Sequence, residues 1–350
     1  MLDRIRPADP ETQGLKPGPL SVSVHQRREF GRLQKQSFYT NEIADVDPDL
    51  SAAIKREKWP FAQDFDQIAN DAPTRTLDHK LALFYADGNS FGTHQRAASA
   101  DLLNDWDCAI KAHRRTLLAK ILEAYADVGC DAHDRRDGNP IRFETLLWGG
   151  DEMIFVMPAW RGIEFTEQFF DLTKDWTFNE TKLTHAVGLV FCHDNAPIHA
   201  VRKLAQTLAE SAKETTARKG NSINYVVLES FDHVGNAWPD YLRRVYNGKL
   251  CETNRCLTAD EFQSVAGELR KLTEHLPRSR LAPYLQTLIA DNASTDTVRT
   301  ATERRDEDLD DATKQAAKKL TDLRDSCPIA GWSHAADLWD YVKTTEGEQL

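Results

Sequence analysis

The sequence predicts a mixed α/β protein in which an antiparallel sheet with covering helices is followed by a helical C-terminal domain. Two observations lead to this fold class. Between residues 76 and 237, short apolar runs and helical patterns follow the order β-α-β-β-α-β-α-β, which is typical of a ferredoxin-like arrangement. Residues 238–350 show several helical patterns and no convincing strand pattern. With 350 residues, the chain is long enough for two such domains and an additional segment.

The first part of the chain, residues 1–75, is expected to be an N-terminal extension. It is rich in Pro, Gly, Asp and Arg, and a helical pattern stands out only at residues 49–61. The first strand is expected at LALFYA, from Leu81, because a continuous apolar run that ends in a turn suits a strand buried on both faces. A long helix is then expected from about residue 95 to 128, where apolar residues recur every three or four positions.

The next two strands are expected at IRFETLLW and MIFVMPA. Only Gly149, Gly150, Asp151 and Glu152 separate them, which indicates a tight hairpin. The unit is completed by a helix at TEQFFDLTKDW, a strand at HAVGLVFC, a helix over residues 198–218 and a strand at NYVVLES. In the C-terminal domain, helices are expected at residues 259–276, 280–291 and 300–325, the last as a charged helix with a solvated face.

The composition excludes several classes of function. A net charge of -11 and a pI near 5.5 argue against binding nucleic acid through bulk electrostatics. Small charged ligands remain possible, since a metal ion offsets local acidity. The six scattered cysteines favour free thiols in a reducing compartment. Without an apolar run of membrane-spanning length or a signal peptide, we expect a cytoplasmic protein with no membrane partner.

Two acidic residues are predicted to meet at one end of the sheet. In the ferredoxin-like topology the second strand of the hairpin lies antiparallel to the first strand of the unit. Asp87 ends that first strand and Asp151 precedes its neighbour, with Glu152 next along the chain. Nearby carboxylates repel one another unless a cation lies between them, and hard oxygen ligands favour Mg²⁺ or Mn²⁺. Such ions support in-line attack on phosphorus, which is the chemistry of nucleotidyl transfer.

Glycines and one lysine fit the same interpretation. Gly149 and Gly150 permit positive φ at the hairpin, and Gly88 and Gly92 leave room for backbone amides to face phosphate. The alternative is that both glycine motifs are surface turns. Lys213, near the end of the helix over residues 198–218, either contacts a triphosphate or stabilises the helix C-terminus as a cation.

These motifs also carry a family resemblance. The segments ADGNSFG, LLWGGDEMIFVMPA, GLVFCHDNAPIHAVRKLAQTLAESAKE and KGNSINYVVL resemble the polymerase palm of the large polymerase-like subunit of type III CRISPR effector complexes. The chain looks like a stand-alone member of that group, with similarity over roughly residues 80–345. Members of the family convert ATP into cyclic oligoadenylate messengers when the complex detects foreign RNA. Relatives outside CRISPR loci make cyclic nucleotide signals in phage defence.

The resemblance implies roles for individual residues. It places metal ligands at Asp87, at Asp151 and at the backbone carbonyl of Ala86. The residues that it implies to contact the nucleotide are Gly88, Asn89, Ser90, Phe91, Gly149, Gly150 and Lys213. It also implies two metal ions, Mg²⁺ or Mn²⁺, with ATP as the substrate.

The chain departs from the family pattern at several positions. GGDD is here GGDE, and DGD is here DGN, so Asn89 replaces an acid. The chain is too short for the nuclease and first palm domains of the large subunits, and the pairs His133–Asp134 and His193–Asp194 are expected to be structural or exposed. The N-terminal segment lacks the cysteines of the family's zinc-bearing linker, so no zinc is assigned there. Diguanylate cyclases share the palm, but Met153 replaces their hallmark Phe.

The sequence therefore predicts a synthase that condenses nucleoside triphosphates, with ATP favoured, into cyclic di- or oligonucleotides that a downstream effector detects. Asp87, Asp151 and Glu152 are the expected catalytic residues, and Glu152 would assist or orient a water. A second face of the chain or a homodimer must supply the acceptor nucleotide. The alternatives are a non-catalytic nucleotide sensor, favoured by DGN and GGDE, and a subunit of an RNA-guided complex, which the acidic charge disfavours.

Overall fold

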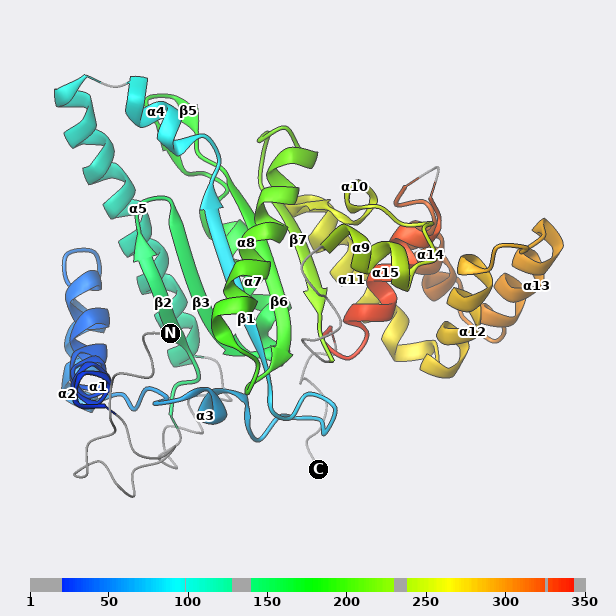
Figure 1. The fold of residues 1–350 in the computed structure, drawn as a ribbon, viewed down its shortest axis with the longest axis horizontal. Helices are drawn as coiled ribbons and strands as arrows, with labels where there is room; N and C mark the ends of the chain where they lie inside the picture. The colour runs from blue at the N-terminus through cyan, green and yellow to red at the C-terminus, as the bar shows by residue number, and fades with distance from the viewer. Residues whose placement is uncertain (1–20, 98, 128–139, 230–237, 325–326, 343–350) are drawn as a thin grey trace. The chain divides into compact units, whose positions relative to one another are not determined.

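The structure is a computed structural model, and it describes residues 21–97, 99–127, 140–229, 238–324 and 327–342 (Figure 1). Its backbone contacts divide the chain into two compact units, one of residues 1–63 and 111–141 and one of residues 64–110 and 142–350. The mixed α/β class predicted from the sequence is confirmed, with helices throughout the C-terminal part. All the candidate site residues belong to the second unit.

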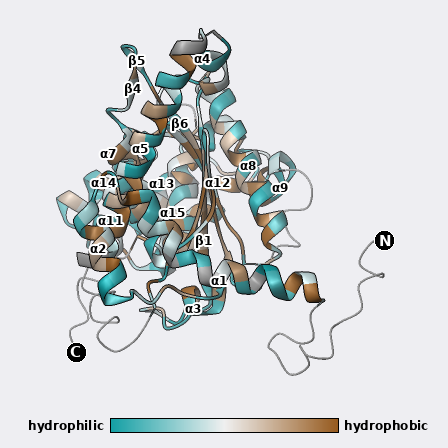
Figure 2. Cartoon of the chain, turned by 90° about the vertical axis from the view of Figure 1, so that its left-hand side faces the viewer, coloured by the Kyte–Doolittle hydropathy of each residue, from teal (hydrophilic) through white to brown (hydrophobic). Residues whose placement is uncertain are grey.

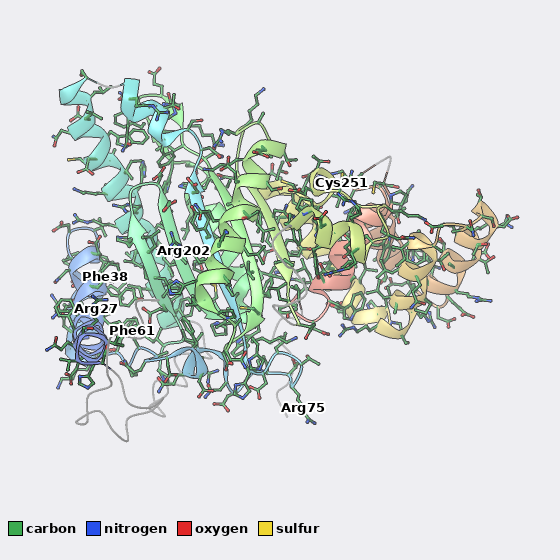
Figure 3. All side chains as sticks on the ribbon, viewed as in Figure 1. Arg27, Phe38, Phe61, Arg75, Arg202 and Cys251 are labelled. Carbon is green, nitrogen blue, oxygen red and sulfur yellow. The ribbon has the colours of Figure 1, made fainter. Side chains whose placement is uncertain are left out.

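The first unit contains a helix that the sequence analysis did not predict. This helix, α1 (Val22–Ile43), precedes α2 (Pro48–Glu57), which corresponds to the helical pattern found at residues 49–61. Among the side chains of α1 that the structure describes, the buried ones lie in its last turns, where Tyr39 stacks on Phe61 with ring centroids 4.5 Å apart and Phe38 packs edge-on against Tyr39. Phe38 and Phe61 are labelled in Figure 3. A helix without a continuous apolar stripe gives no amphipathic signal, so the sequence pattern does not reveal it.

The second unit is built on a six-stranded sheet in the order β2-β3-β1-β6-β7-β8. Neighbouring strands are antiparallel except β6 and β7, which are parallel. Strands β2, β3, β1 and β6 reproduce the predicted ferredoxin-like arrangement. The two-residue strand β8 is an addition that the sequence did not indicate. The strands are β1 (Lys80–Gly88), β2 (Glu144–Gly149), β3 (Glu152–Pro158), β6 (His185–His193), β7 (Ser222–Val227) and β8 (Leu257–Thr258).

Helices α7 (Gly162–Thr173) and α8 (Ile198–Thr215) cover opposite faces of the sheet. A Cβ added to Gly188 of β6 would lie 1.8 Å from the carbonyl oxygen of Ala205 in α8. A Cβ added to Gly162 of α7 would instead lie 2.7 Å from the Phe191 ring. Because Gly188 and Phe191 are an odd number of residues apart on β6, they face opposite sides. The strands between the two helices are strongly apolar, as the brown strands in Figure 2 show.

The long helix expected over residues 95–128 is interrupted. The structure has α4 (Phe91–Ala97) and α5 (Ala100–Asp127). The Ser99 hydroxyl accepts a hydrogen bond from the Leu102 amide at 3.4 Å, as an N-cap residue does, so α5 begins anew after Ser99. A short helix, α3 (Phe65–Ala69), precedes β1, and a small hairpin of β4 (Thr177–Phe178) and β5 (Thr181–Lys182) follows α7.

The C-terminal part is helical, as predicted. Its helices are α9 (Trp238–Val245), α10 (Glu252–Arg255), α11 (Ala259–His275), α12 (Arg278–Ile289), α13 (Thr295–Arg305), α14 (Asp311–Thr321) and α15 (Ile329–Leu338). The single charged helix expected over residues 300–325 is two helices, because Asp310 caps a new N-terminus by accepting from the Thr313 amide at 2.7 Å. No helix within the described ranges is long and apolar enough to cross a membrane.

Candidate functional site

The ends of β1 and β3 bring three acidic residues together. In the antiparallel register, Asp87 lies directly opposite Glu152. Asp151 occupies the hairpin turn one position earlier, and its carbonyl oxygen accepts a hydrogen bond of 3.0 Å from the Gly88 amide. The sequence analysis paired Asp87 with Asp151, and the register shows that Glu152 is the closer cross-strand neighbour. Since directly opposed residues point to the same face, the side chains of Asp87 and Glu152 share one side of the sheet.

Tyr85 connects these two carboxylates. It lies two residues before Asp87 on β1 and therefore points to the same face. Its hydroxyl donates to Glu152 at 2.7 Å and lies 3.5 Å from the Asp87 carboxylate. The sequence analysis did not single out Tyr85, although the two-residue spacing from Asp87 on a predicted strand was a signal that could have indicated it.

Lys213 completes the cluster from α8. Its ammonium group lies 2.7 Å from Asp87, and the lysine side chain is only 6% exposed. A second acid, Glu210, lies at 4.0 Å on the same helix. Lys213 is in the last turn of α8, where a cation is favourable, and its ammonium group also points at the acidic end of β1. The lysine is therefore built into the site and is not merely a helix-terminal cation.

The acids influence one another electrostatically. Burial raises the pKa of Asp87, Lys213 opposes that effect, and the charges of Asp151 and Glu152 raise the pKa further. Burial, followed by the hydrogen bond to Glu152, also raises the pKa of Tyr85 well above its ordinary value. The phenol therefore keeps its proton at neutral pH and acts as a hydrogen-bond donor. A carboxylate cluster with one lysine leaves an excess of negative charge, so this donor set of hard oxygens fits a divalent cation such as Mg²⁺ or Mn²⁺.

Asn89, which stands where the family has a second acid, has a structural position. It is buried, and its amide nitrogen donates to the Thr184 hydroxyl and the Gly220 carbonyl, both at 3.0 Å. Its backbone amide donates to the Thr184 carbonyl at 2.8 Å. These bonds fix the end of β1 to the segments before β6 and β7. The amide side chain therefore positions the loop, and its Oδ1 has no hydrogen-bond partner among the described residues.

The segment after Asn89 is shaped by packing. Ser90 has a positive φ of 62°, and the ring of Phe91 turns back over β1. A Cβ at Gly88 would meet that ring at 2.6 Å, so glycine is required there. Phe91 is buried against Trp106 and His185, with ring centroids 5.3 and 5.5 Å away. The ring is thus part of the core.

The remaining predicted positions surround the hairpin and β1. Ala86 is buried within β1 between Met153 and Val187 of the neighbouring strands. Gly149 ends β2, and Gly150 in the turn has φ of 52°, which favours glycine. Cβ atoms at Gly149 and Gly150 would meet nothing within 4 Å, so there is open space directly beside both glycines. Gly92 lies in α4, and its added Cβ would contact only Arg96, at 4.0 Å.

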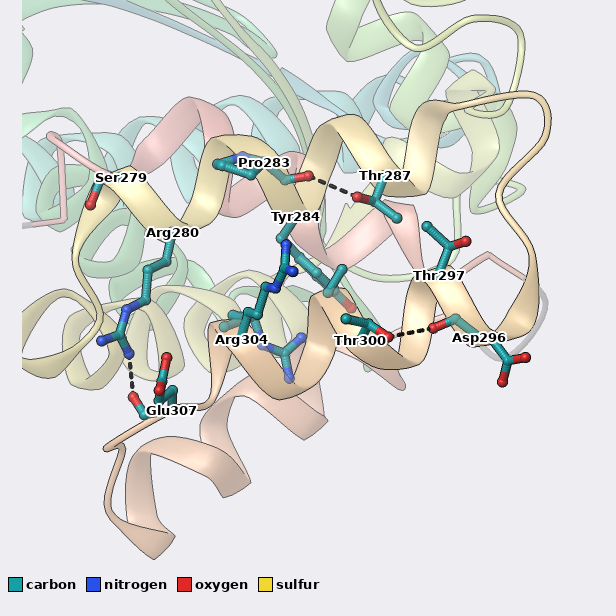
Figure 4. A pocket seen from close by; sticks show the side chains of 12 residues that line it. Ser279, Arg280, Pro283, Tyr284, Thr287, Asp296, Thr297, Thr300, Arg304 and Glu307 are labelled. Carbon is teal, nitrogen blue, oxygen red and sulfur yellow. Dashed lines mark hydrogen bonds between the residues drawn. The ribbon is translucent and has the colours of Figure 1, made fainter.

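A different hollow lies between α12 and α13 (Figure 4). Its volume is about 780 Å³, and its lining includes Tyr284, Arg304 and Arg305 but none of the acids at the end of β1. Arg305 lies between the rings of Tyr284 and Trp332, 4.5 Å from each centroid, and pairs with Asp306. These contacts stabilise the packing of α12, α13 and α15, and we assign this hollow no role in the chemistry.

Comparison with known protein families identifies the sheet and its helices. Residues 80–223 match the family Cas10/Cmr2, second palm domain. The palm of this chain is a relative of the Cas10/Cmr2 second palm domain. The match runs from β1 to the start of β7 and includes Asp87, Asp151, Glu152 and Lys213. The sequence analysis expected similarity over roughly residues 80–345, and the part of that range after residue 223 lies outside the matched segment. A comparison with curated proteins gives no significant match.

The relationship defines the class of the domain. Cas10 palms are polymerase- and cyclase-like, and palm domains of this kind use divalent metal ions, so the chain contains a palm of the nucleotidyltransferase type. The architecture of the sheet and the acidic end of β1 and β3 are consistent with that class. The pair His133–Asp134 lies outside the described residues.

Proposed function

We propose that the protein is a metal-dependent nucleotidyltransferase that joins nucleoside triphosphates, with ATP favoured, into cyclic di- or oligonucleotides. The observation that carries the proposal is the group formed by Asp87, Glu152 and Lys213 beside Asp151, within a Cas10-like palm. Lys213 and Asp87 come from different elements and approach to 2.7 Å, which brings a cation beside the acid that ends β1.

The residues have distinct roles in this proposal. Asp87 and Asp151, with the Ala86 carbonyl, would hold Mg²⁺ or Mn²⁺, which neutralises phosphate charge and lowers the pKa of the attacking hydroxyl. Lys213 would contact a phosphate as a point charge. Glu152, held by the Tyr85 hydroxyl at 2.7 Å, would accept the proton of the attacking 3'-hydroxyl, directly or through water.

The reaction balances without another reactant. The 3'-oxygen of one nucleotide forms a bond to the α-phosphorus of another, the bond from that phosphorus to the pyrophosphate oxygen breaks, and pyrophosphate leaves. A second such step closes the ring. Because the acceptor nucleotide must lie beside the donor, we propose that a homodimer supplies its pocket, and that an effector protein responds to the product in defence signalling.

The test is incubation of the purified protein with each nucleoside triphosphate and Mg²⁺ or Mn²⁺, followed by mass spectrometry of the products. We expect a cyclic product and pyrophosphate from the wild type, and a loss of at least about 100-fold for Asp87→Asn and for Asp151→Asn, since each removes a charged metal ligand. Asp171→Asn is the matched control, because Asp171 is exposed on α7, on the opposite face of the sheet. Full activity of a double Asp87→Asn, Asp151→Asn variant would refute the mechanism.

The structural position of Asn89 favours one second candidate, a nucleotide sensor without turnover. Its amide is engaged by Thr184 and Gly220, so this position contributes no negative charge to the site. The same experiment separates the two functions when it is combined with calorimetry. Nucleotide binding that depends on Asp87, together with no detectable product under any triphosphate and ion, would identify the sensor.

A further inference from the structure

A second cluster of metal-ligating side chains lies at the other end of β1. His79 precedes β1, Asp194 follows β6, and Asp66 belongs to α3. One ligand atom from each residue lies within 4.8 Å of the other two. His79 Nδ1 is 2.9 Å from an Asp194 oxygen and 3.5 Å from an Asp66 oxygen. The three side chains therefore converge on one point.

A fourth side chain joins the group. His193 Nδ1 lies 2.7 Å from the second oxygen of Asp194, and the His79 and His193 rings are nearly parallel, with centroids 5.9 Å apart. Asp194 is 11% exposed, whereas both histidines are about half exposed at 46%. The buried carboxylate thus fixes two accessible imidazoles. The adjacent pair His193–Asp194, which the sequence analysis treated as structural or exposed, is here part of a larger group.

The backbone holds His79 in place at a conformational cost. His79 has φ of 57°, a region that residues with a Cβ seldom adopt. Its amide donates to the Ala69 carbonyl, and its carbonyl accepts from the Asp194 amide, both at 2.9 Å. Such strain persists where the surroundings enforce it, and it is concentrated at functional sites. The two hydrogen bonds orient the imidazole of His79 toward Asp66 and Asp194.

We propose that His79, Asp194 and Asp66 form a binding site for a divalent transition ion of the Zn²⁺ class, with His193 holding the second oxygen of Asp194. Imidazole nitrogen with carboxylate oxygen is a donor set that suits Zn²⁺ and Co²⁺. Ligands about 2.0–2.1 Å from a tetrahedral ion lie roughly 3.3–3.4 Å apart, and the observed separations of 2.9 and 3.5 Å lie on either side of that value.

This site is independent of the acids at the other end of β1. The nine residues of β1 separate the two ends, a length of roughly 25–30 Å at about 3.3 Å per residue. An ion bound by α3, the segment before β1 and the end of β6 would join three parts of the second unit. We therefore expect the bound ion to raise the melting temperature of the protein. We do not expect it to take part in the reaction at the palm acids.

The test uses the full chain after treatment with a chelator. Calorimetry with Zn²⁺ is expected to show one site per chain, and binding should raise the melting temperature. His79→Asn and Asp194→Asn should each weaken binding at least about tenfold. Asn is chosen at position 79 because it tolerates positive φ, so the backbone is kept, and circular dichroism verifies folding of both variants.

Two further measurements distinguish this site from zinc binding by cysteines or by the palm acids. The exposed thiols of Cys108 and Cys251 also attract Zn²⁺, so Co²⁺ is bound in parallel, and its spectrum should lack a thiolate charge-transfer band. Asp87→Asn, which alters the palm acids, should bind Zn²⁺ at this site as the wild type does. Equal binding by wild type, His79→Asn and Asp194→Asn, or no binding at 100-fold excess ion, would show that the four side chains only hydrogen-bond to one another.

Discussion

Among single residues, Tyr85 shows how a buried polar group organises the candidate site. Tyr85 belongs to β1 and is fully buried, and its hydroxyl donates a hydrogen bond to Glu152 at 2.7 Å. Charge-assisted hydrogen bonds of this kind are stronger than neutral ones, so Tyr85 restricts the orientation of Glu152. The proposed role of Glu152 as a proton acceptor depends on that orientation.

The first prediction is that Tyr85→Phe lowers the free energy of unfolding by about 1–2 kcal/mol, because a hydrogen bond to a charged group is lost. Under the proposed function, product formation should fall about threefold to tenfold, since Glu152 is no longer held. Urea denaturation and the product assay measure the two effects. The control is Tyr341→Phe, because the buried Tyr341 hydroxyl has no hydrogen-bond partner among the described residues. Its removal should leave stability unchanged or raised, and equal losses in the two variants would contradict the role given to Tyr85.

The sequence analysis identified some of the site residues and missed others. Asp87, Asp151 and Glu152 were identified because a turn motif and a strand end are local features. Their cross-strand register, and the ion pair of Asp87 with a lysine 126 positions away, depend on how α8 packs on β6 and β1. The group of His79, Asp66 and Asp194 was not found for the same reason, because Asp194 lies 115 positions after His79 in the sequence and further still from Asp66.

At the scale of elements, the close approach of α8 to β6 determines where Lys213 lies. Gly188 makes this approach possible, since any side chain there would overlap the Ala205 carbonyl of α8. Two backbones are therefore in contact, and neither can yield as a flexible side chain would. The position of the lysine relative to Asp87 follows from this contact.

The second prediction concerns this contact. Gly188→Ala should reduce the free energy of unfolding by about 3 kcal/mol, the upper end of the usual range for overpacking, because an added methyl group against a backbone forces α8 away from the sheet. Gly267→Ala in α11 is the matched control, since its added Cβ meets nothing within 4 Å. There, alanine should stabilise the helix by about 0.5–1 kcal/mol. Chemical denaturation of both variants measures the difference, and a stable Gly188→Ala protein would mean that α8 packs less closely than described.

Elements were predicted well where the signal was local and poorly where it was not. The hairpin after β2 was recognised because only Gly149, Gly150, Asp151 and Glu152 separate two apolar runs. The break before α5 depends on a single capping serine, Ser99, within an otherwise continuous helical pattern. The helix α1 has no apolar stripe to reveal it. Periodicity therefore indicates that an element exists, and side-chain caps decide where it is interrupted.

At the scale of the molecule, the acidic chain uses pairs of opposite charge to hold its C-terminal helices. Glu268 of α11 accepts hydrogen bonds from Lys319 of α14 at 2.6 Å and from Lys271 at 3.2 Å. Glu261 pairs with Arg324 and also closes the capping box of α11 with Thr258. These pairs counter the self-repulsion expected for a net charge of -11.

The third prediction is an acid-sensitive stability that arises from these pairs. Burial raises the pKa of Glu268, but hydrogen bonds from Lys319 and Lys271 lower it by more, so its pKa lies below the ordinary value of 4.5. Burial likewise raises the pKa of Glu261, and the hydrogen bond from Arg324 with those from Thr258 brings it below 4.5. A carboxyl whose pKa is depressed on folding stabilises the protein above its unfolded pKa, and this contribution is lost as the pH falls through the folded pKa.

The melting temperature should therefore decline as the pH is lowered below about 4.5, where the unfolded carboxyls begin to bind protons that the folded ones resist. Glu268→Gln should have a lower melting temperature than the wild type at pH 7 and a smaller decline in acid, since glutamine cannot titrate. Glu303→Gln, at an exposed position of α13, is the control and should follow the wild type. Scanning calorimetry from pH 7 to pH 3 provides the comparison. If the curves of wild type and Glu268→Gln remain parallel throughout, the link between α11 and α14 contributes nothing to the acid response.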